Sequence, residues 1–357
     1  MTAPKTLRVV SLPGDGIGPE VCSEAVRVLE LGVKRAGRRL EIIEMDMGGV
    51  AIDRHGEPLP QKTREACLGS DAVLMGAVGG PKWDGLSPDK RPEKGLLGLR
   101  EALGVFANLR PVKARDALLD TSPLRPEIIR GTDLVVVREL LGDLYFGTPR
   151  GVEGKPRRGF NTMVYTEDEV RRIAVVGFDL ARTRKKLVTS VDKANVLETS
   201  RLWRDVVTEV KRDYPDVELR HALVDSCAMD LIRRPTSFDV LLTSNMFGDI
   251  LSDEASVLAG SIGLLPSASI GTGPGFYEPI HGSAPDIAGK GIANPLGAIA
   301  SAAEMLRRSL GMPELADKID RAIDQVLDEG KRTADLGGKV STSQMGGFVC
   351  QALERLF

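Results

Sequence analysis

Residues 7–19 read Leu7-Arg-Val-Val-Ser-Leu-Pro-Gly14-Asp-Gly16-Ile-Gly18-Pro19 and join an apolar run to a glycine-rich turn. The run over 7–12 predicts a β-strand, and apolar side chains at helical spacing over 17–36 predict a helix after the turn. The same order opens the dinucleotide-binding fingerprint of Rossmann folds, but that fingerprint needs its third glycine where Pro19 stands. We therefore interpret the turn as structural.

The alternation of strand-like and helix-like segments continues along the chain. Further strands are predicted over 40–45, 72–75, 134–137, 186–191, 217–224 and 238–242. Further helices are predicted over 166–182, where a capping box opens the segment, and over 194–212, 225–233, 245–260, 295–310 and 314–329. Such alternation is typical of an α/β fold with a mostly parallel central sheet.

The composition suits two domains and argues against some classes of protein. Of the 357 residues 42% are hydrophobic, and 48 basic against 50 acidic residues give a net charge of −2. This balance gives no electrostatic reason to expect nucleic acid or an anionic membrane as a partner. The uncharged stretch over 255–277 is too rich in glycine and proline for a membrane span.

Cysteine usage and the N-terminus favour a cytoplasmic protein. Cys22, Cys67, Cys227 and Cys350 form no C-x-x-C pair and lie at no zinc-ligand spacing from a histidine. We interpret them as reduced thiols. The first residues, Met1 onward, contain no signal-peptide pattern.

Asp249 and Asp253 form the clearest candidate for a metal site. They lie four residues apart in Asn245-Met-Phe-Gly-Asp-Ile-Leu-Ser-Asp, so a helix places both carboxylates on one face. Neighbouring carboxylates repel each other unless a cation lies between them, and oxygen ligands suit Mg²⁺ or Mn²⁺. A solvated acidic face is the alternative. Apolar neighbours such as Phe247 and Ile250 indicate partial burial and favour the metal site.

Basic residues in apolar or turn settings point to an acidic substrate. Arg100, Arg110 and Arg138 each suit a structural ion pair, but together they suggest a di- or tricarboxylate, because guanidinium groups bind carboxylates bidentately. Lys193 follows a predicted strand and is expected to open a helix. An exposed lysine is the ordinary alternative, but a lysine near a metal and away from water can act as a base.

Two further segments are singled out by their composition. The stretch from His281 to Asn294 is rich in glycine and precedes a predicted helix, so its backbone can approach a phosphate or an adenine closely. A long surface connection is the alternative, against which its isoleucines argue. Residues 147–165 are predicted to form a projecting loop or hairpin.

Together these motifs resemble one family, the isocitrate/isopropylmalate dehydrogenases, which are β-decarboxylating dehydrogenases of hydroxy acids. The resemblance runs from Gly14 to Gly346, and seven motifs stand in the family's order. They are the N-terminal turn, Asn108-Leu-Arg-Pro, Arg138-Glu with Tyr145-Phe-Gly, Asp192-Lys-Ala-Asn, Val224-Asp225, Asn245-x-Phe-Gly-Asp-Ile-x-Ser-Asp and Glu278-Pro-Ile-His-Gly-Ser-Ala-Pro. The resemblance implies the family's own two-domain α/β fold with a large, mostly parallel central sheet, which is not a Rossmann fold.

The leucine pair Leu96 and Leu97 indicates which member of the family is most similar. With Gly79-Gly-Pro-Lys-Trp-Asp, it resembles the members that act on 3-isopropylmalate, in which the pair packs on the isopropyl group. Members that act on isocitrate have a polar, serine-bearing pattern there. The implied activity is NAD-dependent oxidative decarboxylation of 3-isopropylmalate to 2-oxo-4-methylpentanoate in leucine biosynthesis.

The resemblance also implies a role for each candidate residue. Arg100, Arg110 and Arg138 would bind the malate carboxylates, and Asp225, Asp249 and Asp253 would bind Mg²⁺ or Mn²⁺, with Asp225 also near the substrate. Lys193 would take the C2 hydroxyl proton, and Tyr145 would deliver a proton to C3. NAD would be bound by Glu93, Asn195, His281, Gly282, Ser283, Ala284, Asp286, Ile287 and Asn294.

The same resemblance implies a homodimer with shared active sites. Residues 1–105 with 261–357 would form the cofactor-side domain, and residues 106–260 a central domain with the dimer contacts and an arm at about 147–165. Two positions depart from the family pattern. Leu141-Gly-Asp143 replaces the usual Thr-Gly-Gly, so that a carboxylate is added near Tyr145 and Arg138, and Ser226-Cys227 replaces a commoner Asn-Ala.

Two alternatives remain open. One is a related enzyme that acts on another 2-hydroxy acid, such as homoisocitrate or tartrate. The other is a non-catalytic subunit, against which the presence of Lys193, Tyr145 and the three aspartates argues.

Overall fold

The computed structural model describes residues 6–357, and the chain packs into two compact units. The first unit comprises residues up to Val105, Arg115–Ser122 and Ala259–Phe357; the second comprises Phe106–Ala114 and Pro123–Leu258. The predicted domains differ from these units mainly at Arg115–Ser122, and their bounds stay a prediction. The first five residues, in which the sequence predicts no signal peptide, lie outside the described residues.

The first unit has five strands in the order β2-β1-β3-β12-β11. They are β1 (Leu7–Gly14), β2 (Leu40–Glu44), β3 (Ala72–Ala77), β11 (Pro266–Gly271) and β12 (Gly275–Pro279). All neighbours are parallel except β11 and β12. Because both faces of the central strands are covered, β3 and β12 are buried at every residue.

Helices cover both faces of these strands. Helices α1 (Gly18–Arg35) and α10 (Leu296–Arg308) pack on the strands, and α11 (Pro313–Asp328) and α12 (Thr342–Arg355) pack on α1 and α10. Leu99 and Leu103 of α4 (Pro92–Leu103) form a core with Val10, Leu12 and Phe276 of the strands. Two short helices, α2 (Gly49–His55) and α3 (Gln61–Leu68), complete this unit.

The second unit has five strands in the order β4-β5-β10-β8-β9. They are β4 (Val105–Lys113), β5 (Asp133–Glu139), β8 (Leu187–Asp192), β9 (Glu218–Leu223) and β10 (Val240–Thr243), all parallel except β4 against β5. Helices α6 (Glu167–Arg182) and α7 (Glu198–Val210) form one packed pair, and α8 (Val224–Arg233) and α9 (Asn245–Ser256) form another. A short α5 (Pro126–Ile129) follows β4.

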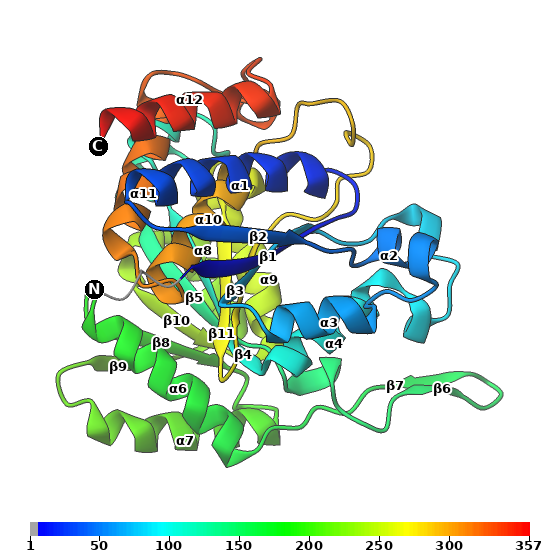
Figure 1. Cartoon of the computed structure of the whole chain (residues 1–357). Helices are drawn as coiled ribbons and strands as arrows, with labels where there is room; N and C mark the ends of the chain where they lie inside the picture. The colour runs from blue at the N-terminus through cyan, green and yellow to red at the C-terminus, as the bar shows by residue number, and fades with distance from the viewer. Residues whose placement is uncertain (1–5) are drawn as a thin grey trace, which may run out of the picture. The chain divides into compact units, whose positions relative to one another are not determined.

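The predicted arm is a hairpin. Strands β6 (Gly151–Glu153) and β7 (Arg158–Phe160) pair antiparallel and extend away from the rest of their unit (Figure 1). Val152 at this hairpin is 70% exposed, so the hairpin has little packing of its own within one chain.

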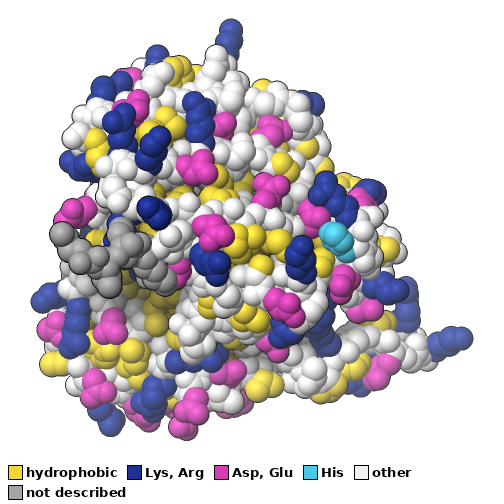
Figure 2. Space-filling model, in the orientation of Figure 1, with side chains coloured by type: hydrophobic (Ala, Val, Ile, Leu, Met, Phe, Trp, Pro, Cys, Tyr) yellow, Lys and Arg dark blue, Asp and Glu magenta, His cyan; other side chains and the backbone are white. Residues whose placement is uncertain are grey.

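The α/β class and all seven predicted strands are confirmed, and so is the capping box at Thr166. A strand expected after a helix within the uncharged stretch over 255–277 corresponds to β11, while β4, β12 and the helices α2, α3, α4, α5 and α12 were not predicted. One local prediction is wrong: Lys193 does not open a helix, since the turn after β8 continues to Leu197 and α7 begins at Glu198. On the face drawn in Figure 2, acidic and basic side chains are interspersed, in keeping with the balanced charge.

Candidate active site

Two buried arginines lie on neighbouring strands of the second unit. Asn108 of β4 is paired with Arg138 of β5, so Asn108, Arg110 and Arg138 lie on the same face of the sheet. Arg110 Nε donates to Asn108 Oδ1 at 2.7 Å, and its Nη1 donates to Ser252 Oγ at 2.6 Å. Arg138 Nε donates to Asn245 Oδ1 at 2.9 Å. These neutral partners orient the guanidinium groups but leave their charges to be balanced by anions.

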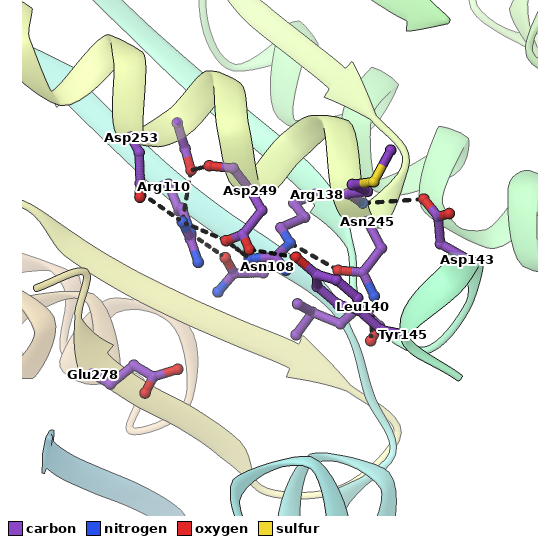
Figure 3. Close-up of polar contacts among 12 residues, drawn as sticks. Asn108, Arg110, Arg138, Leu140, Asp143, Tyr145, Asn245, Asp249, Asp253 and Glu278 are labelled. Carbon is purple, nitrogen blue, oxygen red and sulfur yellow. Dashed lines mark hydrogen bonds and ion pairs between the residues drawn. The ribbon is translucent and has the colours of Figure 1, made fainter. Parts of the chain in front are cut away.

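Helix α9 provides the anions. Arg110 Nη1 lies 3.6 Å from Asp249 Oδ1 and 3.7 Å from Asp253 Oδ1, and Arg138 forms an ion pair with Asp249. Figure 3 shows the two carboxylates on the same side of α9, facing the strands. Their side chains are 36% and 63% exposed, so the cluster is open to solvent on its carboxylate side. Burial raises the pKa of Asp253, and the charge of Arg110 opposes this shift.

Tyr145 joins the same cluster from the turn after β5. Its hydroxyl donates to Asp249 Oδ2 at 2.7 Å, and its ring lies 5.6 Å from the guanidinium of Arg138. Burial, together with the hydrogen bond to Asp249, raises the pKa of Tyr145 to about 12. The phenol therefore keeps its proton at neutral pH and can act as an acid.

Lys193 and Asp225 form a separate pair in the second unit. Lys193 Nζ lies 2.6 Å from Asp225 Oδ1 at the start of α8, and this hydrogen bond lowers the pKa of Asp225. Within residues 6–357 no three histidine, cysteine or acidic side chains converge as a metal site. One chain therefore does not bring the predicted ligand Asp225 together with Asp249 and Asp253.

Arg100 lies in the first unit with Glu278 as its acidic partner. Arg100 Nη2 is 2.6 Å from Glu278 Oε1, and each side chain is only 10% exposed. Among the described residues, Arg100 Nε has no hydrogen-bond partner although it is buried. Leu96 and Leu97 precede it on α4 and are both half-buried, and Leu96 packs against the core of the unit. Glu93 is exposed in the first turn of α4.

The glycine-rich stretch borders an apolar pocket of about 390 Å³ in the first unit. Nε2 of His281 is buried without a hydrogen-bond partner among the described residues, and burial lowers the pKa of this histidine, so its ring is neutral at neutral pH. Asn294 Nδ2 donates to Asp335 Oδ2 at 3.0 Å. Residues that line the pocket include Ile17, Ile262, His281, Ala284, Ile287, Asn294 and Asp335. Apolar walls with a few polar groups suit a flat heteroaromatic base.

The remaining predicted cofactor residues lie at the surface or beside this pocket. Gly282 and Asp286 are exposed, whereas Ser283, which lies between them in the sequence, is buried. Asn195 is exposed in the second unit, two residues after Lys193.

The N-terminal glycine turn supports this loop, as the structural interpretation predicts. A β-carbon at Gly16, where φ is +59°, would lie 2.0 Å from the carbonyl oxygen of Ser283. The Glu20 carboxylate accepts from the backbone N–H groups of Gly289 at 2.5 Å and Gly291 at 3.1 Å. The turn and the start of α1 therefore pack against the backbone of this loop.

The cysteines offer no catalytic thiol. All four are free and buried, and burial raises the pKa of Cys22 to about 11 and those of Cys67 and Cys227 to about 12. Because the thiolate is the reactive form, these thiols are poor nucleophiles. No helix in the described part of the chain combines the length and apolarity that crossing a membrane requires.

Comparisons with known proteins place the chain in a family. The family model described as isocitrate/isopropylmalate dehydrogenase matches residues 8–349, so the chain belongs to this family of dehydrogenases. Among its relatives, a 3-isopropylmalate dehydrogenase of Anaeromyxobacter dehalogenans is 59% identical over 97% of this chain and 99% of its own. Another from Aquifex aeolicus is 55% identical over 99% and 98%.

The fold comparison agrees with the sequence comparison. The crystal structure of isocitrate dehydrogenase from Methylococcus capsulatus has a TM-score of 0.87 at 35% identity and covers 97% of this chain and 99% of its own. The resemblance inferred from the motifs, and the fold class with it, is confirmed.

Sequence reasoning missed several residues that complete the cluster. Asn108, Asn245 and Glu278 stand inside the recognised motifs, so their neighbours gave the signal for them. Ser252 also stands inside a recognised motif, next to Asp253, whereas Asp335 lies in none of the seven motifs and its contact with Asn294 joins segments distant in sequence.

Proposed function

We propose that the chain catalyses the NAD-dependent oxidative decarboxylation of 3-isopropylmalate to 2-oxo-4-methylpentanoate in leucine biosynthesis. The observation that carries this proposal is the cluster of Arg110 and Arg138 against Asp249 and Asp253. It presents two cations for the substrate carboxylates and two anions for a divalent metal. Relatives at 55–59% identity that carry the name 3-isopropylmalate dehydrogenase support the choice of substrate.

Charge balance explains why substrate and metal would bind together. The substrate dianion and a divalent cation add no net charge to the site. When both bind, each arginine can pair with a substrate carboxylate in place of an aspartate. Each aspartate can then bind the metal in place of an arginine. The bidentate geometry of guanidinium groups suits such carboxylates. Substrate alone would leave the two aspartates without counter-charges.

The residues of the chain have separate tasks in the reaction. The partner subunit's Lys193 takes the proton of the C2 hydroxyl as hydride leaves C2 for the nicotinamide. The C3 carboxylate then leaves as CO₂, its bonding electrons pass to C3 and the C2 oxygen, and Tyr145 protonates C3. The position of Tyr145 supports this role, because its hydroxyl carries a proton and lies in the same cluster, 2.7 Å from Asp249 Oδ2.

The metal and NAD supply chemistry that side chains lack. Asp249, Asp253 and the partner subunit's Asp225 would hold Mg²⁺ or Mn²⁺, which as a Lewis acid favours negative charge on the C2 oxygen. The oxygen-only donor set and the exposure of Asp253 fit such an ion. NAD would supply the hydride acceptor, and the pocket beside His281 would hold its adenosine.

The separate location of Lys193 and Asp225 supports a homodimer with shared sites. Apolar side chains are exposed on the packed pair α8 and α9: Met229 by 57%, Ile250 by 58% and, just beyond α9, Val257 by 37%. A two-fold axis through this surface would bury them against their own copies. We also propose a cytoplasmic location, supported by the four free cysteines.

The test is NADH formation from a panel of 2-hydroxy acids. With Mg²⁺, 3-isopropylmalate should give the highest kcat/KM, above isocitrate, homoisocitrate and tartrate, and EDTA should abolish the reaction. A higher kcat/KM for another acid would reject the substrate, and the absence of NADH with every acid would reject the enzyme.

A further inference from the structure

Helix α9, which carries Asp249 and Asp253, begins without a cap of its own. The residue before its first turn is Ser244, whose hydroxyl is buried and makes no hydrogen bond among the described residues. The first turn also contains no acidic residue. A helix begins with backbone N–H groups that need acceptors, and its positive end favours a negative charge. The acceptors for α9 must therefore come from another segment.

The turn after β5 supplies one of these acceptors through a carboxylate. Asp143 Oδ2 accepts from the backbone N–H of Met246 at 3.0 Å, and Asp143 Oδ1 accepts from that of Leu144 at 2.7 Å. The neighbouring N–H of Asn245 is bound by the Tyr165 hydroxyl at 2.9 Å. Figure 3 shows Asp143 directed toward the start of α9. Asp143 is fully buried, so its carboxylate depends on these donors.

The backbone at Asp143 has an unusual conformation. Its φ is +71°, in the left-handed region that glycine adopts freely and that aspartate and asparagine tolerate better than other residues. A glycine would satisfy the backbone without strain. An aspartate at this position is therefore informative, because only its side chain reaches Met246.

We propose that Asp143 is a positioning residue: by capping α9 it fixes the turn that carries Tyr145 against the helix that carries Asp249. Asp143 and Tyr145 belong to the same short turn, η4 (Asp143–Tyr145), and Tyr145 donates to Asp249 at 2.7 Å. One turn thus contacts α9 twice, at its first residues and one turn further on. Asp143 is buried and its carboxylate accepts from backbone N–H groups, so we place its effect on the reaction in the positioning of Tyr145. This inference rests on the role of Tyr145 given under the proposed function.

The test compares two substitutions that differ in the acceptor alone. Asp143→Gly removes the carboxylate and relieves the positive φ, so the chain should still fold. Its kcat should fall about tenfold, the effect of losing one hydrogen bond to a charged group, with KM for 3-isopropylmalate within about twofold. Asp143→Asn keeps an oxygen acceptor and tolerates the same φ, so it should restore kcat to within about threefold of wild type.

A second arm asks whether the effect passes through Tyr145. In a Tyr145→Phe background, Asp143→Gly should cost less than about twofold in kcat, because coupled residues lose their effect together. An equal loss in both backgrounds would overturn the proposal. Full activity of Tyr145→Phe alone would instead reject the role of Tyr145, and the inference with it, without touching the proposed reaction.

A matched control separates positioning from stability. Thr166→Ala removes the cap of α6, which carries no proposed site residue, since Thr166 Oγ1 accepts from the backbone N–H of Glu169. It should lower the melting temperature about as much as Asp143→Gly does, while kcat stays within about twofold of wild type. If kcat falls equally in both variants, or if Asp143→Gly changes only the melting temperature, Asp143 is merely structural.

Discussion

The hydroxyl of Tyr145 donates to Asp249 Oδ2 at 2.7 Å, so the proposed proton donor and a proposed metal ligand share one hydrogen bond. Asp249 is also the ion-pair partner of Arg138 and lies 3.6 Å from Arg110. A single carboxylate thus contacts the groups proposed for acid catalysis and for substrate binding. This makes Asp249 the most informative position in the cluster.

Replacing Asp249 with asparagine should weaken metal binding and turnover without unfolding the chain. The substitution keeps the size of the side chain but removes its charge, so kcat should fall by orders of magnitude and half-activation should need more Mg²⁺. Circular dichroism should show unchanged helix content. Asp216→Asn, which removes a carboxylate from an exposed ion pair with Arg182, is the control and should keep activity within about twofold. Wild-type activity that persists in excess EDTA would contradict a metal role.

The choice of cofactor should depend on Asp286. Its exposed carboxylate would accept hydrogen bonds from the adenosine ribose and repel a 2′-phosphate, while Ile287 lines the pocket. We expect NAD to be preferred over NADP, and Asp286→Lys with Ile287→Tyr to weaken this preference. The measurement is kcat/KM for each cofactor. Equal wild-type efficiency with NAD and NADP would remove this role from Asp286.

The substrate preference should depend on the leucine pair of α4. Burying a small apolar group stabilises binding by about 1–3 kcal/mol, so Leu96 and Leu97 should each contribute that much to preferring the isopropyl group. Leu97→Ser is the cleaner variant, because Leu96 also packs against the core and its loss should lower stability. The ratio of kcat/KM for 3-isopropylmalate to that for isocitrate measures the effect. An unchanged ratio in the variant that combines Leu96→Ser and Leu97→Ser would mean that the isopropyl group does not bind at this pair.

Much of the fold followed from the sequence because its strands are apolar and its helices amphipathic. The missed strand β4 contains Asn108 and Arg110 at buried positions, so functional side chains interrupt the pattern that identifies a strand. Helix α12 was not predicted because Gly346 and Gly347 lower the helix propensity of its sequence. At Gly346 a β-carbon would lie 2.0 Å from the Glu24 carboxylate, so packing against α1 requires the glycine.

The site was predicted less completely than the fold. Motifs pointed to Arg110, Arg138 and Asp249, but two of the contacts that orient the arginines join positions more than 100 residues apart: Arg110 with Ser252 and Arg138 with Asn245. The departure at Asp143 was visible in the sequence. Its carboxylate reaches Met246 rather than Arg138, and its charge is a minor cause of the raised pKa of Tyr145, after burial and Asp249. The direction in which the Asp143 side chain points follows from the structure and not from the sequence.

Acid should destabilise the protein partly through His281. Burial lowers the pKa of its imidazole below the ordinary value of 6.5, so as the pH falls below 6.5 the unfolded chain takes up a proton that the folded chain does not. The free energy of unfolding should therefore fall, by at most about 1.4 kcal/mol per pH unit from this group. Its contribution should be constant above pH 7.

The substitution His281→Gln removes the titrating imidazole. The unfolding free energy of this variant should therefore depend less steeply on pH between 7 and 5 than that of the wild type. The measurement is urea unfolding without cofactor at several pH values. Parallel curves for the two proteins would mean that folding does not change the pKa of His281.

The last prediction concerns how two chains build one site. Lys193 pairs with Asp225, and the described residues do not join this pair to Asp249 and Asp253 in one chain, which supports an active site that takes Lys193 from the partner. Arg100→Ala and Lys193→Ala should each be nearly inactive as homodimers. Unfolded and refolded together, half the dimers are mixed, and each has one site with both defects and one with neither. Activity should therefore recover to about a quarter of wild type.

Arg100→Ala mixed with Asp249→Asn is the matched control: both residues serve the same subunit's site, so no intact site forms and activity should stay near zero. If mass spectrometry confirms mixed dimers but the first mixture stays inactive, Lys193 serves its own subunit.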